Sequence, residues 1–246
     1  MAEGTSVEKA RLYEQYRLPY PADLADDLLR QIGSVKVIAD IGAGTGQLAR
    51  LFADQCETVY AVEPDSAMRR VAAETLNAYP NIHIVDGSAE QTTLVENSID
   101  LIVIGNAFHR FRAEAIDELR RILKPGGWVT LMSYLFTDTA FADMLFPKLS
   151  QLPGMESRSR RNVHRLPFEM LFGEHETHTL SYAQSILEDW VAFWGSAQSG
   201  IEAPETGDAD FPQFEAINRE VFEALAVEGR IRMAYETRVV FGQIEG

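Results

Sequence analysis

Short apolar runs alternate with amphipathic segments along the first two-thirds of the chain. The runs are nearly continuous in hydrophobicity and rich in β-branched and aromatic residues: VKVIADIG (35–42), TVYAVEP (58–64), NIHIVDG (81–87), SIDLIVIGN (98–106) and WVTLMSY (128–134). This pattern is typical of strands that are buried on both faces of a parallel sheet.

The segments between these runs have helical spacing. Leu48, Leu51 and Phe52 fall on one face, and Asp65 is a candidate N-cap for a helix that reaches residue 78. The segment RAEAIDELRRIL (112–123) carries one apolar side and ends at the helix-breaking sequence KPGG (124–127). Strand, helix and strand in repeated succession predict βαβ units and a doubly wound sheet.

The last third has a different pattern. HETHTLSYA (175–183) and RIRMAYETRVVFGQI (230–244) predict two further strands, separated by helical patterns around 186–194 and 214–225. The stretch 135–172 shows no clean period, yet its apolar content favours a packed cap. We therefore expect one domain (1–246) with an α/β fold. Its Rossmann-like, doubly wound sheet would be mostly parallel with a last antiparallel strand, and the cap would be a small insertion at about 135–172.

Three glycines follow the first predicted strand. Gly42, Gly44 and Gly46 have the spacing G-x-G-x-G, with Asp40 two residues ahead, whereas a dinucleotide-binding turn has G-x-G-x-x-G. A helix N-terminus that faces a pyrophosphate disfavours an acid just before the turn. A ligand with an ammonium and a sulfonium reverses that preference, and Asp40 could then accept from the ammonium.

A carboxylate stands at the end of the second predicted strand. Glu63 precedes Pro64, and the residue before a proline is held extended, so Glu63 is kept at the strand tip. There it could accept hydrogen bonds from the hydroxyls of an adenosine ribose. A dinucleotide and a sulfonium cofactor would both use such an acid, so only the glycine spacing separates them.

Five ordered motifs resemble those of the class I S-adenosylmethionine-dependent methyltransferases. They are YEQYRLPYPADL, DIGAGTG, VEPDSAM, VDGSAEQTTLVENSIDLIVIGNAFHRF and ELRRILKPGGWV. The first looks like the N-terminal segment of the small-molecule branch, often called methyltransferase domain type 11. The resemblance extends from about Tyr13 to Tyr134 and implies S-adenosyl-L-methionine as the cofactor.

The resemblance also implies roles for individual residues. Asp40, Gly42, Gly44 and Gly46 would form the turn around the methionine and ribose, with Gln47 beginning the helix. Glu63 would hold the ribose, and Pro64 would lie near the adenine. The remaining cofactor candidates are Ser88 and Ala89 at the adenine edge, Asn106 near the methionine, and Arg17 at its carboxylate. Many relatives have aspartate at the Ser88 position, so Ser88 departs from the family pattern.

Candidates for the methyl acceptor's site are less specific. His109 follows the fourth predicted strand and is either a general base or a pocket-lining residue. Tyr20 is a pocket candidate because aromatic faces attract a sulfonium. Arg160 and Arg161 belong to an arginine cluster at 158–165 that is either a solvated loop or a lid for an anionic acceptor. The second interpretation predicts an acidic small molecule.

Net charge, apolar segment length and cysteine content limit the kinds of partner and compartment that this protein would have. The formal net charge of −15 disfavours nucleic acid and anionic membrane surfaces as partners. The apolar stretch 99–108 is far shorter than the ~20 residues that span a bilayer, and the N-terminus lacks a signal-peptide pattern. Cys56 alone cannot form an internal disulfide or a cysteine-cluster metal site. We expect a cytoplasmic protein without a metal, and its oligomeric state stays open.

Three other functions compete with small-molecule methylation. A Rossmann dehydrogenase is disfavoured by the glycine spacing. A non-catalytic protein that binds the cofactor would use the same residues, so the sequence does not separate it. Methylation of RNA or protein is disfavoured by the negative charge.

Overall fold

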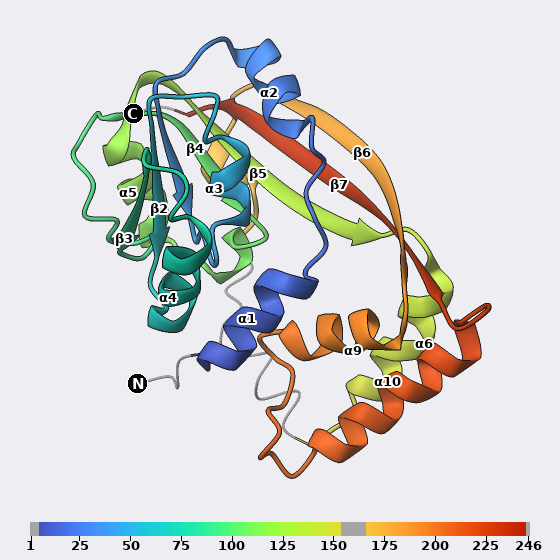
Figure 1. Ribbon diagram of the computed structural model, residues 1–246. Helices are drawn as coiled ribbons and strands as arrows, with labels where there is room; N and C mark the ends of the chain where they lie inside the picture. The colour runs from blue at the N-terminus through green and yellow to red at the C-terminus, as the bar shows by residue number, and fades with distance from the viewer. Residues whose placement is uncertain (1–4, 154–165, 245–246) are drawn as a thin grey trace.

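The computed structural model describes residues 5–153 and 166–244. A seven-stranded sheet in the order β3-β2-β1-β4-β5-β7-β6 organises this part of the chain (Figure 1). Strands β1 to β5 pair in parallel, and β7 is antiparallel to both β5 and β6. The bounds are β1 (Val37–Ile41), β2 (Thr58–Glu63), β3 (Ile82–Asp86), β4 (Ile99–Gly105), β5 (Leu123–Phe136), β6 (Thr177–Glu188) and β7 (Ile231–Gln243). The expected fold class is confirmed.

Helices cover both faces of the sheet. On one face α2 (Leu24–Ile32) and α3 (Gln47–Leu51) pack with Ile38 of β1 and Leu101 of β4. On the other face α5 (Glu114–Ile122) and α8 (Glu169–Phe172) pack with Ala39 and Ile41 of β1. Because successive residues of β1 enter opposite layers of the core, this strand needs apolar side chains at nearly every position.

Local signals set several element ends. Asp65 caps α4 (Ser66–Thr75), since its Oδ1 accepts from the backbone N–H groups of Ala67 and Met68 at 2.8 and 3.0 Å. The N-cap prediction is therefore confirmed. Helix α5 ends at Ile122, and Leu123 already pairs with Ile99 of β4.

The helix that the sequence pattern predicted around 186–194 was placed too early in the chain. Ile186 pairs with Met233 inside the β6–β7 ladder, and β6 continues to Glu188. Asp189 then caps α9 (Trp190–Ser199) by accepting from the backbone N–H of Ala192 at 3.0 Å. Apolar residues of the strand end and of the helix start adjoin in the sequence, so periodicity alone did not separate them.

Three helices form a cap beyond the ends of β5, β6 and β7 (Figure 1). They are α6 (Thr139–Leu149), α9 and α10 (Phe211–Leu225). Phe141, Phe193 and Phe222, one from each helix, share one hydrophobic cluster. Only α6 comes from the expected cap stretch, and the other two helices connect β6 to β7. We call α6, α9 and α10 the cap helices.

Helix α1 (Val7–Tyr16) lies between α4 and the cap helices (Figure 1). Ala10 packs with Met68 of α4, and the Tyr16 ring lies so close to Gly195 of α9 that a Cβ there would approach it within 2.3 Å. The Lys9 ammonium donates to the carbonyls of Ile201 and Ala203 at 3.2 and 2.6 Å. Helix α1 therefore joins the sheet layer to the cap.

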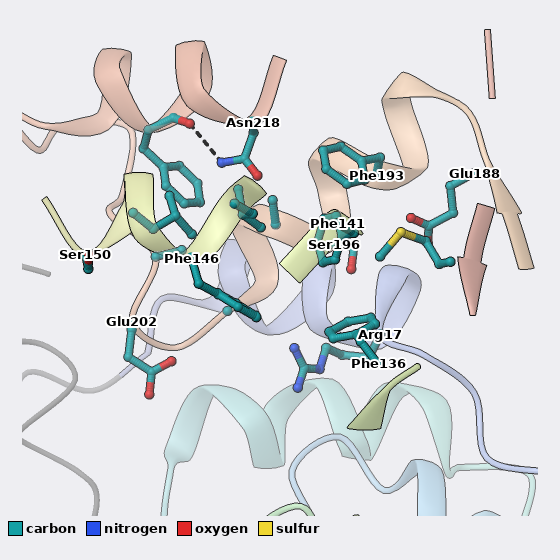
Figure 2. Close-up of a pocket in the computed structure, with 17 residues that line it drawn as sticks. Arg17, Phe136, Phe141, Phe146, Ser150, Glu188, Phe193, Ser196, Glu202 and Asn218 are labelled. Atoms are coloured by element: carbon teal, nitrogen blue, oxygen red, sulfur yellow. Dashed lines mark hydrogen bonds between the residues drawn. The ribbon is translucent and has the colours of Figure 1, made fainter. Parts of the chain in front are cut away.

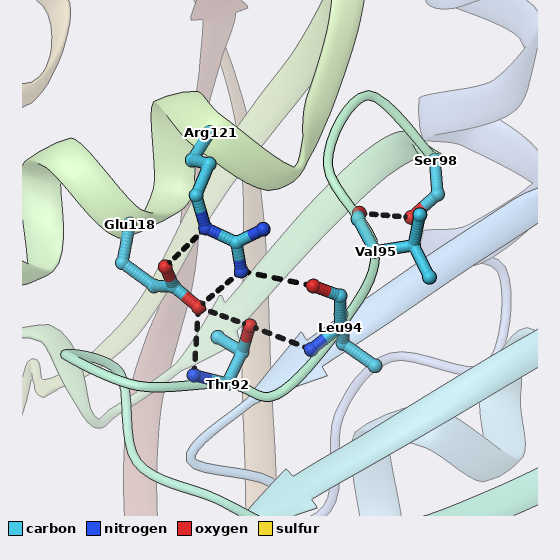
Figure 3. A network of polar contacts seen from close by, with 6 residues as sticks. All are labelled: Thr92, Leu94, Val95, Ser98, Glu118 and Arg121. Atoms are coloured by element: carbon cyan, nitrogen blue, oxygen red, sulfur yellow. Dashed lines mark hydrogen bonds and ion pairs between the residues drawn. The ribbon is translucent and has the colours of Figure 1, made fainter.

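A polar network fixes the loop between β3 and β4 on α5 (Figure 3). Glu118 Oε1 accepts from the backbone N–H of Thr92 at 2.8 Å and from its hydroxyl at 2.5 Å. Arg121 donates to Glu118 and to the carbonyl of Leu94 at 2.9 Å. Because Thr92 is fully buried, these bonds satisfy polar groups that have no access to water.

No helix within residues 5–153 and 166–244 combines the length and apolarity needed to cross a membrane.

Candidate functional site

A cavity of about 520 Å³ opens at the carboxyl ends of the parallel strands. Its walls come from the turn after β1, the tip of β2, the loop after β3 and the tip of β4, with Thr5 before α1 and Tyr13 within α1. The predicted cofactor residues that line it are Gly42, Gly44, Glu63, Pro64, Ser88, Ala89 and Asn106. We call it the first cavity.

The glycine turn is tightly packed behind this cavity. All three glycines have positive φ, at 74°, 58° and 84°. A Cβ on Gly42 would lie 2.7 Å from the Cβ of Ala107, and one on Gly46 would lie 2.4 Å from Leu76. A Cβ on Gly44 would meet only the Tyr13 ring, at 3.7 Å. Gly42 and Gly46 therefore let the turn pack, whereas Gly44 leaves room for a ligand.

Glu63 ties the tip of β2 to the glycine turn. Its Oε2 accepts from the backbone N–H of Gly44 at 2.8 Å, and its Oε1 accepts from that of Asp65 at 2.9 Å. The side chain is 8% exposed, and burial raises the pKa of its carboxyl group. Each carboxylate oxygen has a second acceptor position, so Glu63 can still accept a hydrogen bond from the hydroxyl of a ligand in the cavity.

Asp40 and Gln47 lie outside the cavity lining. Asp40 is 1% exposed behind the turn, and its Oδ2 accepts from the backbone N–H of Ala49 at 3.0 Å. Burial raises the pKa of Asp40 to about 7. A cation held nearby would favour its ionised form. Gln47 donates to the carbonyl of Glu14 at 3.0 Å and thereby holds α1 against the turn.

Asn106 and Tyr20 form a pair at the tip of β4. Asn106 has φ 51°, and its side chain donates to the Tyr20 hydroxyl at 3.1 Å and accepts from the backbone N–H of Tyr134 at 3.3 Å. Burial raises the pKa of Tyr20, which keeps its hydroxyl neutral. Tyr20 lines neither this cavity nor the one beside it. The structure thus places Tyr20 as a support for Asn106.

A second cavity, of about 650 Å³, lies among the cap helices (Figure 2). Its walls are largely aromatic, with Phe136, Phe141, Phe146, Phe193 and Phe214. Its charged and amide side chains are Arg17, Glu188, Glu202 and Asn218.

The two cavities adjoin. Arg110 lines the first and Glu202 the second, and their side chains form an ion pair at 3.3 Å. Arg17 lines the second, and its guanidinium lies 5.1 Å from the centre of the Tyr13 ring, which lines the first. Ile201 faces the first cavity, and its chain neighbour Glu202 faces the second. A narrow partition of a few side chains therefore separates the two spaces.

The remaining predicted residues are scattered. Arg17 reaches the second cavity rather than the first, and its guanidinium also lies 5.4 Å from the Tyr134 ring. His109 is exposed on the 3₁₀ helix η1 (Phe108–Arg110) and lines neither cavity. Although part of the side chain is exposed, desolvation of the ring by its neighbours, followed by the charge of Arg110, lowers the pKa of His109, which favours the neutral imidazole. Arg160 and Arg161 lie outside the described residues.

Sequence reasoning missed Glu188 and Asn218. Asn218 stands one turn from both Phe214 and Phe222, so it falls on the apolar face of α10. Glu188 ends the run SILE at the close of a strand. A polar residue at an otherwise apolar position was the signal available for both.

Part of the chain is similar in sequence to known proteins. A family model described as a methyltransferase domain matches residues 39–131. An uncharacterized methyltransferase of Geobacillus thermodenitrificans is 36% identical over 173 residues, which cover 63% of this chain and 75% of that protein. One from Geobacillus sp. strain WCH70 is 34% identical over 145 residues, 57% of this chain and 62% of that protein. The chain spans about half the length of a Mycobacterium bovis relative, at 48%.

The fold also occurs in solved structures. The YcgJ protein of Bacillus subtilis superposes with a TM-score of 0.59 at 17% identity, covering 90% of this chain and 98% of that one. From the relatives and the family model, the chain belongs to the class I S-adenosylmethionine-dependent methyltransferase family that its motifs predicted.

Proposed function

We propose that the protein transfers a methyl group from S-adenosylmethionine, held in the first cavity, to a small-molecule acceptor held in the second. The observation that carries this proposal is the adjacency of the two cavities across the partition of Arg17, Arg110 and Glu202. When bound, the cofactor supplies an electrophilic methyl on a sulfonium. The protein's task is then to align the acceptor about 3 Å from that methyl and to exclude water.

The first cavity suits this cofactor by size and by charge. Its volume falls within the range of about 300–1,000 Å³ that is usual for small-molecule sites. Among the described residues, its charged side chains are the acids Glu63, Asp65 and Glu90 and the base Arg110, which is paired with Glu202. Such a lining favours a cationic ligand and disfavours the pyrophosphate of a dinucleotide.

Individual residues would divide the work of holding the cofactor. Glu63 would accept hydrogen bonds from the ribose hydroxyls, and Ser88 would face the adenine edge. Asn106, which donates a hydrogen bond to Tyr20, would lie near the methionine. Asp40 lies behind the glycine turn, and its negative charge would stabilise the ammonium of the cofactor. Arg17 faces the second cavity, so a bond from it to the methionine carboxylate stays a prediction.

The second cavity supports a small acceptor rather than a macromolecule. Most of its residues come from α6, α9, α10 and the adjoining strand ends, joined by Arg17 and the loop after α9, which leaves space for a metabolite-sized molecule. The net charge of −15 also disfavours RNA. The expectation of an acidic acceptor depends on Arg160 and Arg161, which lie outside the described residues. We place the activity in the cytoplasm, because the single cysteine suits a reducing compartment.

Calorimetric titration tests the cofactor half of this proposal. S-adenosylmethionine and S-adenosylhomocysteine are expected to bind with one site per chain, and NAD to bind weaker by roughly two orders of magnitude or not at all. Tight NAD binding together with no response to S-adenosylhomocysteine would contradict it.

A further inference from the structure

Asn218 places an unsatisfied oxygen in the wall of the second cavity. The residue is fully buried, and its side-chain amide donates to the carbonyl of Phe214 at 2.8 Å. Its Oδ1 has no hydrogen-bond partner among the described residues. In Figure 2 the dashed line from Asn218 marks the donated bond, and the oxygen lies on the side of the labelled phenylalanines. A buried carbonyl oxygen without a donor destabilises the fold unless a ligand or water supplies one.

Glu188 places a carboxylate in the same cavity. It ends β6 and is 7% exposed, and its carboxylate forms no hydrogen bond or ion pair with the described residues that surround it. Figure 2 shows its carboxylate turned toward the part of the cavity where Phe141 and Ser196 lie. Burial, with a smaller effect of Asp189, raises the pKa of Glu188 to about 7. A buried carboxylate is normally paired, so this one is suited to a partner that arrives with a ligand.

The walls between these two oxygens are apolar and aromatic. The rings of Phe136 and Phe141 lie 5.2 Å apart and those of Phe141 and Phe193 lie 5.9 Å apart, both in edge-on arrangements. Leu145 and Met233 complete this surface. Such walls bind a ring or a branched apolar body, and aromatic faces also attract a cation.

Arg17 is the opposing observation, because a guanidinium in the lining attracts anions. It stands at the partition, however, between the rings of Tyr13 and Tyr134. The interior of the cavity, around Glu188 and Asn218, contains no other cation among the described residues. The interior therefore offers a ligand a carboxyl group and an amide oxygen.

We propose that the acceptor is an apolar, ring-sized molecule carrying an amine, and that Glu188 accepts from its ammonium while Asn218 accepts from a second donor or a bridging water. This inference rests on the proposed function, since it names the acceptor class for the same site. The arginine cluster at 158–165 suggested an acidic acceptor, whereas this inference favours a basic one.

Three probes of similar size test this inference: 2-phenylethylamine, 2-phenylethanol and 3-phenylpropionate. Their dissociation constants are measured by calorimetry at pH 7.5, with and without saturating S-adenosylhomocysteine. The amine is expected to bind at least roughly tenfold tighter than the carboxylate. Glu188→Gln, which preserves shape and removes charge, should weaken amine binding roughly tenfold and leave S-adenosylhomocysteine affinity unchanged.

The control variant is Glu223→Gln, an exposed carboxylate on the same cap, which should change nothing. Asn218→Leu removes the unsatisfied oxygen at similar side-chain size, and it should weaken amine binding even if Glu188→Gln fails to fold. Equal or tighter binding of the carboxylate, unaltered amine affinity in Glu188→Gln, or no binding of any probe would overturn the inference. Each of these results leaves the proposed function standing, whereas failure to bind S-adenosylhomocysteine removes it.

Discussion

The side chain of Glu63 has a structural role and also lies in the wall of the first cavity. It bonds the backbone of Gly44 and of Asp65, which joins the glycine turn to the start of α4, and its carboxylate borders the first cavity. Removing its charge therefore alters the shape of the cavity as well as one ligand contact.

We predict that Glu63→Gln weakens S-adenosylmethionine binding by about 1.5–3 kcal/mol, the scale of hydrogen bonds to a charged group. Part of this loss comes from the amide nitrogen of glutamine, which faces a backbone N–H where a carboxylate oxygen had accepted. Calorimetry measures the change, with the exposed Glu57→Gln as control. Unchanged affinity in a folded variant would remove Glu63 from the cofactor site.

At the scale of elements, the loop between β3 and β4 depends on its attachment to α5. This loop carries Ser88, Ala89 and Glu90 into the first cavity, and the network of Thr92, Glu118 and Arg121 fixes its far end (Figure 3). The network is local to one helix and one loop, so its loss should loosen the adenine side of the cavity without disturbing the sheet.

We predict that Glu118→Ala lowers the free energy of unfolding by about 1–3 kcal/mol, because buried donors of Thr92 lose their acceptor. Hydrogen bonds from Arg121 and Thr92 lower the pKa of Glu118. Its stabilisation is therefore present above the pKa of the unfolded chain and is lost as pH falls through the lower pKa of the folded protein.

The measurement is urea unfolding of both proteins at several pH values, with Asp117→Asn as the control because its side chain is 89% exposed. The difference between wild type and Glu118→Ala should shrink in acid. A difference that is absent at pH 7, or that grows in acid, would contradict the assigned role.

Element types were predictable where local chemistry and periodicity agreed. Strands β1, β2 and β4 are apolar at nearly every position because both faces are covered, and Asp65 marks the start of α4 by its own hydrogen bonds. The end of β6 was not predictable, since Ile186 is held in the strand by Met233, a residue far along the chain. The second cavity depends on such distant pairings throughout, so its lining could not be read from spacing.

At the scale of the whole molecule, the two cavities differ in how much of their lining belongs to the segment that the family model matches. The family model matches residues 39–131, which supply most of the first cavity. The cap helices and the ends of β6 and β7 lie beyond it and enclose the second cavity. The proposed cofactor residues were therefore accessible to motif comparison, while the proposed acceptor residues Glu188 and Asn218 came only from the structure.

The partition between the cavities is where the two halves of the molecule meet. Lys9 holds the chain at Ile201 and Ala203 against α1, and the ion pair of Arg110 with Glu202 closes the same region. Under the proposed function both cavities would be occupied together, and the side chains of the partition would have to leave a gap through which the acceptor's nucleophile comes within about 3 Å of the methyl.

Transfer of a labelled methyl group tests the central claim most directly. The protein is incubated with S-adenosylmethionine labelled on its methyl group and with a cell extract divided into small-molecule, RNA and protein fractions. We predict that label enters the small-molecule fraction, and that Glu63→Gln reduces this transfer at a limiting concentration of S-adenosylmethionine. Label confined to RNA or protein, or no transfer to any fraction by a protein that binds the cofactor, would contradict the account.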